Sequence, residues 1–149
     1  MDKKLLRKTF FPSLIILLLV LAQSFQLQAA STDPFEISEV KFCRNVDKNR
    51  NPGDVTSKFP QGTQTIYAWF SWKNAPRSQK ITAGWHYVSE DIHILDTPIT
   101  LTRRTDQGVL SLKMPKDKSL PEGSYRLDIA ADGKVLKSAS FTVLPRSSR

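Results

Sequence analysis

Cysteine is almost absent from this chain of 149 residues, since Cys43 is the only one. One cysteine cannot close a disulfide within the chain, which excludes a fold stapled by internal disulfides. The stability of the protein must therefore come from a hydrophobic core. Cys43 ends a stretch of alternating apolar residues, which favours a buried thiol over a reactive one. Its role, including pairing with another chain, stays open at this point.

Motifs of common catalytic sites are missing as well. The sequence has no Gly-x-Ser-x-Gly elbow and no glycine-rich phosphate-binding loop. Its cysteine and histidines do not stand in a local arrangement typical of nucleophilic catalysis. The acidic residues fall mostly in expected turns and outward positions, so no pair stands out for glycoside cleavage. The sequence predicts a protein that is not an enzyme and that needs no cofactor.

The long uncharged apolar run near the N-terminus, residues 10–21, follows a start with four Lys or Arg and precedes a segment that ends in small residues. This layout predicts a secretory signal peptide at residues 1–30, cleaved after Ala29 or Ala30. The run is shorter than the roughly 20 residues of a membrane-spanning helix, so an uncleaved anchor is the weaker alternative. We expect an exported protein, periplasmic or secreted, with no stable membrane span after processing.

The remaining residues, 31–149, suffice for one domain with one core, which we place at residues 35–144. Without residues 1–30 the formal charge falls from +8 to +5, with 18 basic against 13 acidic side chains. This mild positive charge suits anionic polymers or acidic partners of the cell envelope, but it is too small to indicate nucleic acid. No Asn-x-Ser/Thr sequon occurs, which fits an unglycosylated bacterial product.

Period-two alternation of apolar residues recurs along the domain, and no useful amphipathic helical repeat is present. The apolar phase shifts between Ile37 and Val40, which predicts a bulge or an edge position in the first strand. Pro98 separates two expected short strands. The expected strands lie at residues 35–42, 63–73, 79–88, 91–95, 98–103, 109–115, 124–131 and 134–144. Seven or eight short antiparallel strands predict an all-β sandwich.

The last hairpin is the clearest segment, because Asp132-Gly133 is a preferred two-residue hairpin turn. The stretch "LPEGSYRLDI…DGKVLKSASFTV" resembles the closing hairpin of immunoglobulin-like and fibronectin-III-like domains of bacterial envelope proteins. Tyr125, just after Pro121-Glu122-Gly123, fits their tyrosine corner. Together with "IYAWFSWKNA" and "ITAGWHY", it looks like a group of uncharacterised exported bacterial domains. The resemblance implies a single immunoglobulin-like β-sandwich and is nearly silent on function.

Four aromatic rings crowd the stretch "IYAWFSW", residues 66–72. In a strand, Tyr67 and Trp69 point to one face, and Phe70 and Trp72 point to the other. One face must be core, and we expect Trp85 of the next strand to pack across the sandwich. If Phe70 and Trp72 are core, then Tyr67 and Trp69 stand exposed side by side as a binding patch.

The candidate binding site therefore consists of Tyr67 and Trp69, helped by the nearby charges of Lys73 and Arg77. We expect a non-catalytic domain that binds an envelope protein. The first strand is a candidate edge for strand addition. A carbohydrate- or cell-wall-binding module is the alternative, and salt-sensitive attachment to anionic polymer is a third hypothesis. The identity of the partner and the oligomeric state stay open.

Two further groups of residues suggest a metal, and neither fits well. The loop at residues 44–54 mimics a calcium loop through Asp47, Asn49 and Asn51, but Pro52 and Lys58 take the places of its required Gly and acid.

The two histidines, His86 and His93, lie on adjacent expected strands and can approach each other, with Glu90 and Asp91 in the turn between. Their spacing is not a recognised metal signature. We expect a solvated loop at residues 44–54 and no metal at either place.

Overall fold

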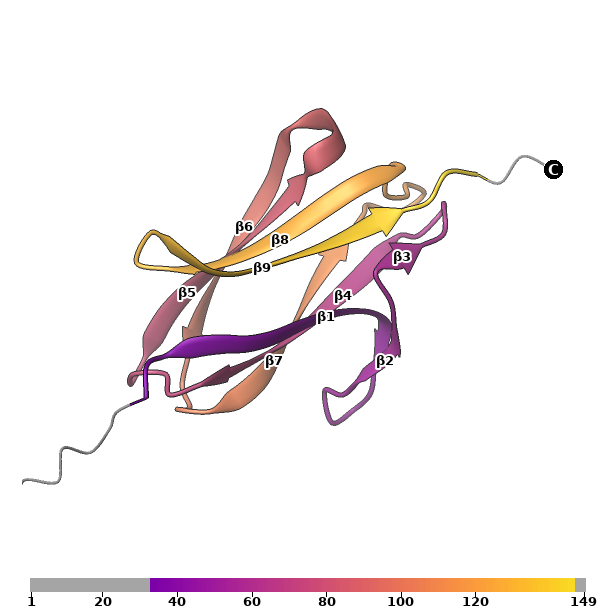
Figure 1. The fold of residues 1–149 in the computed structure, drawn as a ribbon. Coiled ribbons are helices and arrows are strands. Elements are labelled where there is room, and N and C mark those ends of the chain that lie inside the picture. Colours follow the sequence, from indigo (N-terminus) through magenta and orange to yellow (C-terminus); the bar gives the residue numbers. More distant parts are fainter. Residues whose placement is uncertain (1–32, 147–149) are drawn as a thin grey trace, which may run out of the picture. The chain divides into compact units, whose positions relative to one another are not determined.

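The structure is a computed structural model that describes residues 33–146. The predicted signal peptide, residues 1–30, lies outside the described residues. Within residues 33–146 no helix is long and apolar enough to cross a membrane. Two sheets pack face to face and form an all-β sandwich, which confirms the expected fold class (Figure 1).

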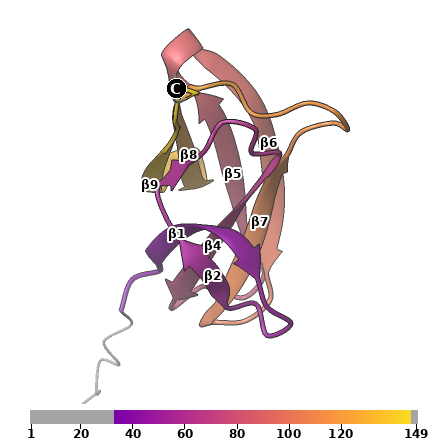
Figure 2. The same cartoon turned by 90° about the vertical axis from the view of Figure 1, so that its right-hand side faces the viewer.

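Nine strands and one short 3-10 helix make up the described part. The elements are β1 (Glu36–Val46), β2 (Pro52–Val55), β3 (Lys58–Phe59), β4 (Thr65–Lys73), β5 (Gln79–Tyr87), η1 (Val88–Glu90), β6 (Ile92–Leu101), β7 (Asp106–Lys113), β8 (Gly123–Ala131) and β9 (Lys134–Val143). Sheet A has the order β2-β1-β4-β7, and sheet B has the order β3-β9-β8-β5-β6. The link between β6 and β7 passes from sheet B to sheet A, on the right-hand side of Figure 2. All strand pairs are antiparallel except β3 with β9.

The first strand carries the predicted bulge, because the register with β4 shifts between Ile37 and Glu39. β1 is not the outermost strand of its sheet, since β2 pairs with its C-terminal part from Cys43 to Val46. The remaining N-terminal part of β1 pairs with β4 alone. The Lys137 Nζ of β9 donates to the backbone oxygen of Ser38 at the bulge, 3.3 Å away. The expected free edge is thus short, kinked and partly covered.

The core lies between the sheets, and β4 contributes one complete face to it. Ile66, Ala68, Phe70 and Trp72 are buried, whereas the residues between them are half-buried on the outer face. Trp85 of sheet B lies across the sandwich from Phe42 of sheet A, with ring centroids 6.3 Å apart, as predicted. Aromatic rings of this kind supply much of the apolar area that a domain of this size must bury.

The last hairpin forms as expected from its local signals. Asp132 and Gly133 both have positive φ, 50° and 76°, as the type I′ turn requires. The hydroxyl of Tyr125 donates to the backbone oxygen of Pro121 at 2.7 Å, which confirms the tyrosine corner. Burial raises the pKa of this phenol. This hydrogen bond holds the segment that precedes β8 against Tyr125 of β8.

Two expectations about the strands were wrong. Pro98 does not divide two strands, because β6 runs through it with Pro98 opposite Thr82. β6 is the outermost strand of sheet B, where a missing N–H on the open side costs no ladder bond. The strand β2 begins inside the expected polar loop at residues 44–54, and β3 arises in a segment where no strand was expected. They are four and two residues long, too short to show a period.

Candidate binding face on sheet A

The outer face of sheet A carries the aromatic pair singled out in the sequence. Tyr67 and Trp69 alternate with the buried residues of β4, and both are half-buried. Trp69 lies between Lys41 of β1 and Val109 of β7 in the register of the sheet. The Nζ atom of Lys41 lies 5.2 Å from the centre of the Trp69 ring, in a cation–π arrangement. One face of the indole is therefore already occupied by an ammonium group.

The loop between β1 and β2 crosses this outer face. The guanidinium of Arg50 donates from Nη1 to the backbone oxygen of Gln107 at 2.8 Å, and its Nη2 lies 3.5 Å from Asp106 Oδ1. The side-chain amide of Gln107 in turn donates to the backbone oxygen of Asn49 at 3.4 Å. Since β4 lies between β1 and β7, the loop must pass over the outer face of β4. It passes over the strand that holds Trp69.

The loop at residues 44–54, which was expected to be a solvated loop, is shaped by hydrogen bonds to Asp47. The carboxylate of Asp47 accepts the backbone N–H groups of Asn49 and Asn51, both at 2.8 Å, and the side-chain amide of Asn51 at 2.9 Å. These hydrogen bonds, above all those from Asn51, lower the pKa of Asp47. A carboxylate that accepts these hydrogen bonds fixes the shape of the loop.

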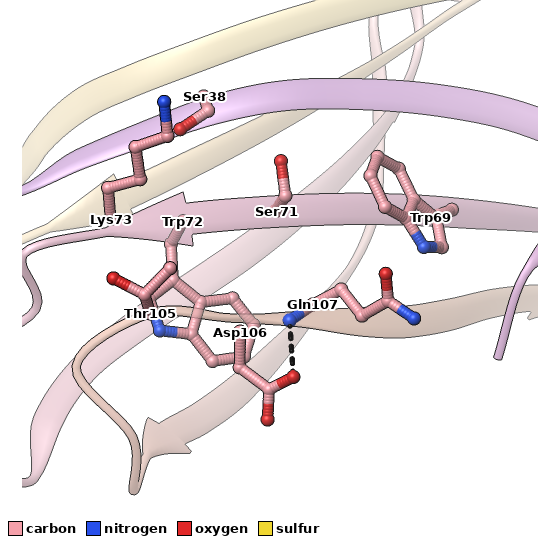
Figure 3. Close-up of a pocket in the computed structure, with 8 residues that line it drawn as sticks. All are labelled: Ser38, Trp69, Ser71, Trp72, Lys73, Thr105, Asp106 and Gln107. Atoms are coloured by element: carbon pink, nitrogen blue, oxygen red, sulfur yellow. Dashed lines mark hydrogen bonds between the residues drawn. The ribbon is translucent and has the colours of Figure 1, made fainter. Parts of the chain in front are cut away.

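A shallow depression of about 250 Å³ opens beside Trp69. It is lined by Ser38, Trp69, Ser71, Trp72, Lys73, Thr105, Asp106 and Gln107. Figure 3 shows Trp69 and Lys73 on the same strand, with Gln107 and Asp106 on the neighbouring segment. The indole Nε1 of Trp69 is enclosed and has no hydrogen-bond partner in residues 33–146, a property it shares with Trp85 in the core.

Charges of both signs border the depression. Lys73 is exposed at the end of β4. Asp106 is mostly covered and accepts the backbone N–H of Gln107 at 2.9 Å. Its carboxylate also lies 3.3 Å from the guanidinium of Arg103. The negative charge of Asp106 is thus paired with the guanidinium groups of Arg50 and Arg103, whereas Lys73 is exposed to solvent.

The structure brings together only part of the predicted site. Trp69 and Lys73 both line the depression, and Tyr67 lies two residues along the same face. Arg77 is exposed in the connection from β4 to β5 and does not line the depression. Asp106 and Gln107, with Thr105 just before them, were missed, because only the register between β4 and β7 places Asp106 opposite Trp72 and Gln107 opposite Ser71. No local signal in the sequence points to that register.

Cys43 lies on the same outer face, beside Tyr67 in the register of β1 and β4. Its side chain is nevertheless fully buried, as predicted. The thiol lies 3.9 Å from the backbone oxygen of Tyr67, and burial raises its pKa. A covered thiol with a raised pKa holds little thiolate, so Cys43 is a packing residue in this face.

The two histidines meet on the outer face of sheet B, where His86 of β5 pairs with His93 of β6. The acids close to them are Asp128 and Asp96, not the expected Glu90 and Asp91 of the turn. The described residues contain no group of three or more His, Cys, Asp or Glu that could hold a metal ion.

No protein-family model matches the chain, and no curated protein matches its sequence. Among solved structures, the chain is similar to an immunoglobulin-like protein from Pseudomonas aeruginosa, with a TM-score of 0.52 and 10% identity. That match covers 76% of this chain and 98% of the other. It shows an immunoglobulin-like fold. An alkylpurine DNA glycosylase from Pseudomonas fluorescens, solved bound to DNA, matches with a TM-score of 0.42 and 18% identity over 72% of this chain and 31% of its own.

Proposed function

We propose that this protein is an exported, non-catalytic domain of the cell envelope that binds a partner protein through the outer face of sheet A. The observation that carries the proposal is Trp69, a half-buried indole beside an open depression on a face that no other sheet covers. Tryptophan is one of the residues that most often contribute a large share of the binding energy at protein interfaces, especially where it lies in a pocket. The proposed export rests on the layout of residues 1–30.

A protein partner fits this face better than a sugar does. A sugar needs an open aromatic ring face on which to stack, but Lys41 lies over one face of Trp69. The loop that carries Arg50 also crosses the face, which makes it uneven. A protein partner can instead fill the depression and place an acid against Lys73. The carbohydrate-binding alternative retains one supporting observation, the two neighbouring rings of Tyr67 and Trp69.

The test is retention of an envelope extract on the immobilised unit that begins at Asp33, which forms a compact unit. We expect one protein to be retained at low and at high salt, and to be lost with Trp69→Ala. Val135→Ala is the matched control, because Val135 is an exposed apolar residue on the other sheet and should leave retention unchanged.

Other outcomes of this experiment would contradict the proposal. Retention of polysaccharide that depends on Trp69 would establish the carbohydrate-binding alternative. Loss of all retained material at high salt would indicate electrostatic attachment through the net positive charge. Retention of the same protein by the wild type and Trp69→Ala alike would place the interface elsewhere.

A further inference from the structure

A second polar cluster lies on the outer face of sheet B, away from the proposed binding face. It is built by four neighbouring strands, β9, β8, β5 and β6. Its members are Gly84, His86, His93, Asp96, Arg126, Asp128 and Ser138. Both histidines of the chain belong to it. The proposed interface uses none of these residues.

A β-bulge places His93 directly opposite His86. The register of β5 with β6 runs from Trp85 opposite Leu95 to His86 opposite His93, so that Ile94 has no partner. Without this extra residue, Ile94 would face His86, and His93 would point to the other side of the sheet. Bulges of this kind re-aim side chains next to functional sites.

The two imidazoles meet through the same atom. Nδ1 of His86 lies 3.5 Å from Nδ1 of His93. The opposite nitrogen of each ring lies close to a carboxylate: Nε2 of His86 is 3.3 Å from Asp128, and Nε2 of His93 is 3.3 Å from Asp96. A carboxylate beside Nε2 favours the tautomer that carries its proton there. In that tautomer both Nδ1 atoms present bare lone pairs to each other.

The carboxylate behind His86 is held firmly in place. Asp128 accepts from Nε of Arg126 at 2.9 and 3.0 Å and from the hydroxyl of Ser138 at 2.6 Å. Its side chain is only 14% exposed. The ring of His86 therefore has a fixed neighbour, as metal-binding histidines usually have in the carboxylate or carbonyl behind them.

Two facing lone pairs repel each other unless a proton or a metal ion lies between them. We propose that His86 and His93 bind a divalent transition-metal ion, with Zn²⁺ as the type case, through their two Nδ1 atoms. Two nitrogens on a tetrahedral Zn²⁺ with bonds of about 2.0–2.1 Å lie about 3.3–3.4 Å apart. The observed Nδ1–Nδ1 separation of 3.5 Å is close to this value. Asp96 and Asp128 then orient the two rings from behind.

The site has two protein ligands and leaves the remaining positions to water. The side chains of His86 and His93 are 28% and 49% exposed, so that an ion can enter from solvent. An open site of this kind exchanges its metal and has places for a ligand from a second molecule.

Gly84 makes room for the cluster. A Cβ atom on Gly84 would lie 3.0 Å from Oδ1 of Asp96 and 3.3 Å from Nε2 of His86. Both contacts are tight. They involve Asp96 and the Nε2 atom of His86, not the Nδ1 atoms that would bind the metal. Glycine in a strand interior is otherwise unfavourable, and here it permits the close approach of side chains.

The rival occupant of the gap is a single proton shared by the two Nδ1 atoms. The two are distinguishable, because protons and metal compete for the same lone pairs. A pair that only shares a proton shows no saturable zinc binding at any pH.

The experiment is a calorimetric titration of the untagged unit that begins at Asp33 with Zn²⁺, followed by histidine-selective NMR. A histidine tag must be absent, so that the only imidazoles are His86 and His93. We expect saturable binding of one Zn²⁺, with both imidazole signals shifting together. His93→Gln should weaken binding by at least tenfold, and Asp96→Asn by roughly 10- to 100-fold.

The matched control is Asp91→Asn, which removes an exposed acid from the turn between β5 and β6 but none near the rings. It should leave the zinc affinity unchanged. His93 and Asp96 are exposed on the outermost strand, so their variants should keep the circular dichroism spectrum of the folded domain. Absence of saturable binding in the folded wild type, or binding that His93→Gln does not weaken, would overturn the proposal.

Discussion

At the scale of single residues, the sandwich gives sequence neighbours opposite environments. Phe70 is 2% exposed and packs in the core, whereas Trp69, one position earlier, is half-buried on the outer face. Gly108 of β7 makes room for the Phe70 ring, because a Cβ there would lie 2.6 Å from Phe70 Cζ. The contribution of an aromatic ring in β4 to stability therefore depends on whether its side chain points into the core or to the outer face.

The contrast between these two rings can be measured. Phe70→Ala should lower the free energy of unfolding by about 3–5 kcal/mol, because it leaves a cavity in the core. Trp69→Ala should lower it by about 1 kcal/mol or less, because the ring lies outside the core cluster. Chemical denaturation of both variants checks this. Equal losses would mean that Trp69 is a core residue and that the proposed binding face is wrong.

At the scale of elements, the loop from β1 to β2 connects stability with the candidate site. It is shaped by Asp47, fixed to β7 by Arg50, and crosses the outer face of sheet A. Loops placed on a rigid scaffold in this way commonly carry binding residues. The depression beside Trp69 thus depends on a segment far from it in sequence.

The pH dependence of stability should report this loop. The pKa of Asp47 is lowered from 3.8 in the folded state, so its contribution is present above that value and is lost as the pH falls through the folded-state pKa. Asp47→Asn should therefore flatten the acid side of the stability profile. Denaturation at several pH values from about 6 to about 2 measures this. Identical profiles for wild type and variant would show that the loop hydrogen bonds add nothing to stability.

Local patterns predicted the elements better than the contacts between them. The bulge in β1, the Asp132-Gly133 turn and the Tyr125 corner each follow from residues close in sequence, and all three were predicted. The continuous strand through Pro98 was not predicted. A strand tolerates proline when it is the outermost strand of its sheet, and the sequence does not show that β6 has this position. The contact of His86 with Asp128 and the position of Gln107 opposite Ser71 likewise depend on strand register, which sequence alone does not show.

At the scale of the whole molecule, the domain has a hydrophobic core and no internal disulfide. The described residues contain one cysteine, and it is fully buried. The core joins both sheets through rings such as Phe42, Trp85 and Phe141. A domain of this size can fold on such a core without covalent links.

The redox state of the solution should therefore not affect stability. We expect the same melting temperature with and without a reducing agent, because there is no internal disulfide to break. Cys43 should react with a thiol reagent only after unfolding, since burial covers it and raises its pKa. A lower melting temperature in reductant would point to a disulfide between two copies. Rapid labelling of the native protein would contradict the buried position.

The two ends of the domain differ in what lies beside them. At the entry to β1, the backbone oxygen of Pro34 accepts from the side-chain amide of Asn74, next to Lys73 of the depression. At the exit from β9, the N–H of Leu144 donates to Phe59, at the opposite end of the sheets (Figure 1). A fluorophore, bead or display anchor attached after Arg146 would hold the depression outward, whereas the same attachment before Asp33 would crowd it. The direction of tethering thus decides whether a captured partner can reach Trp69.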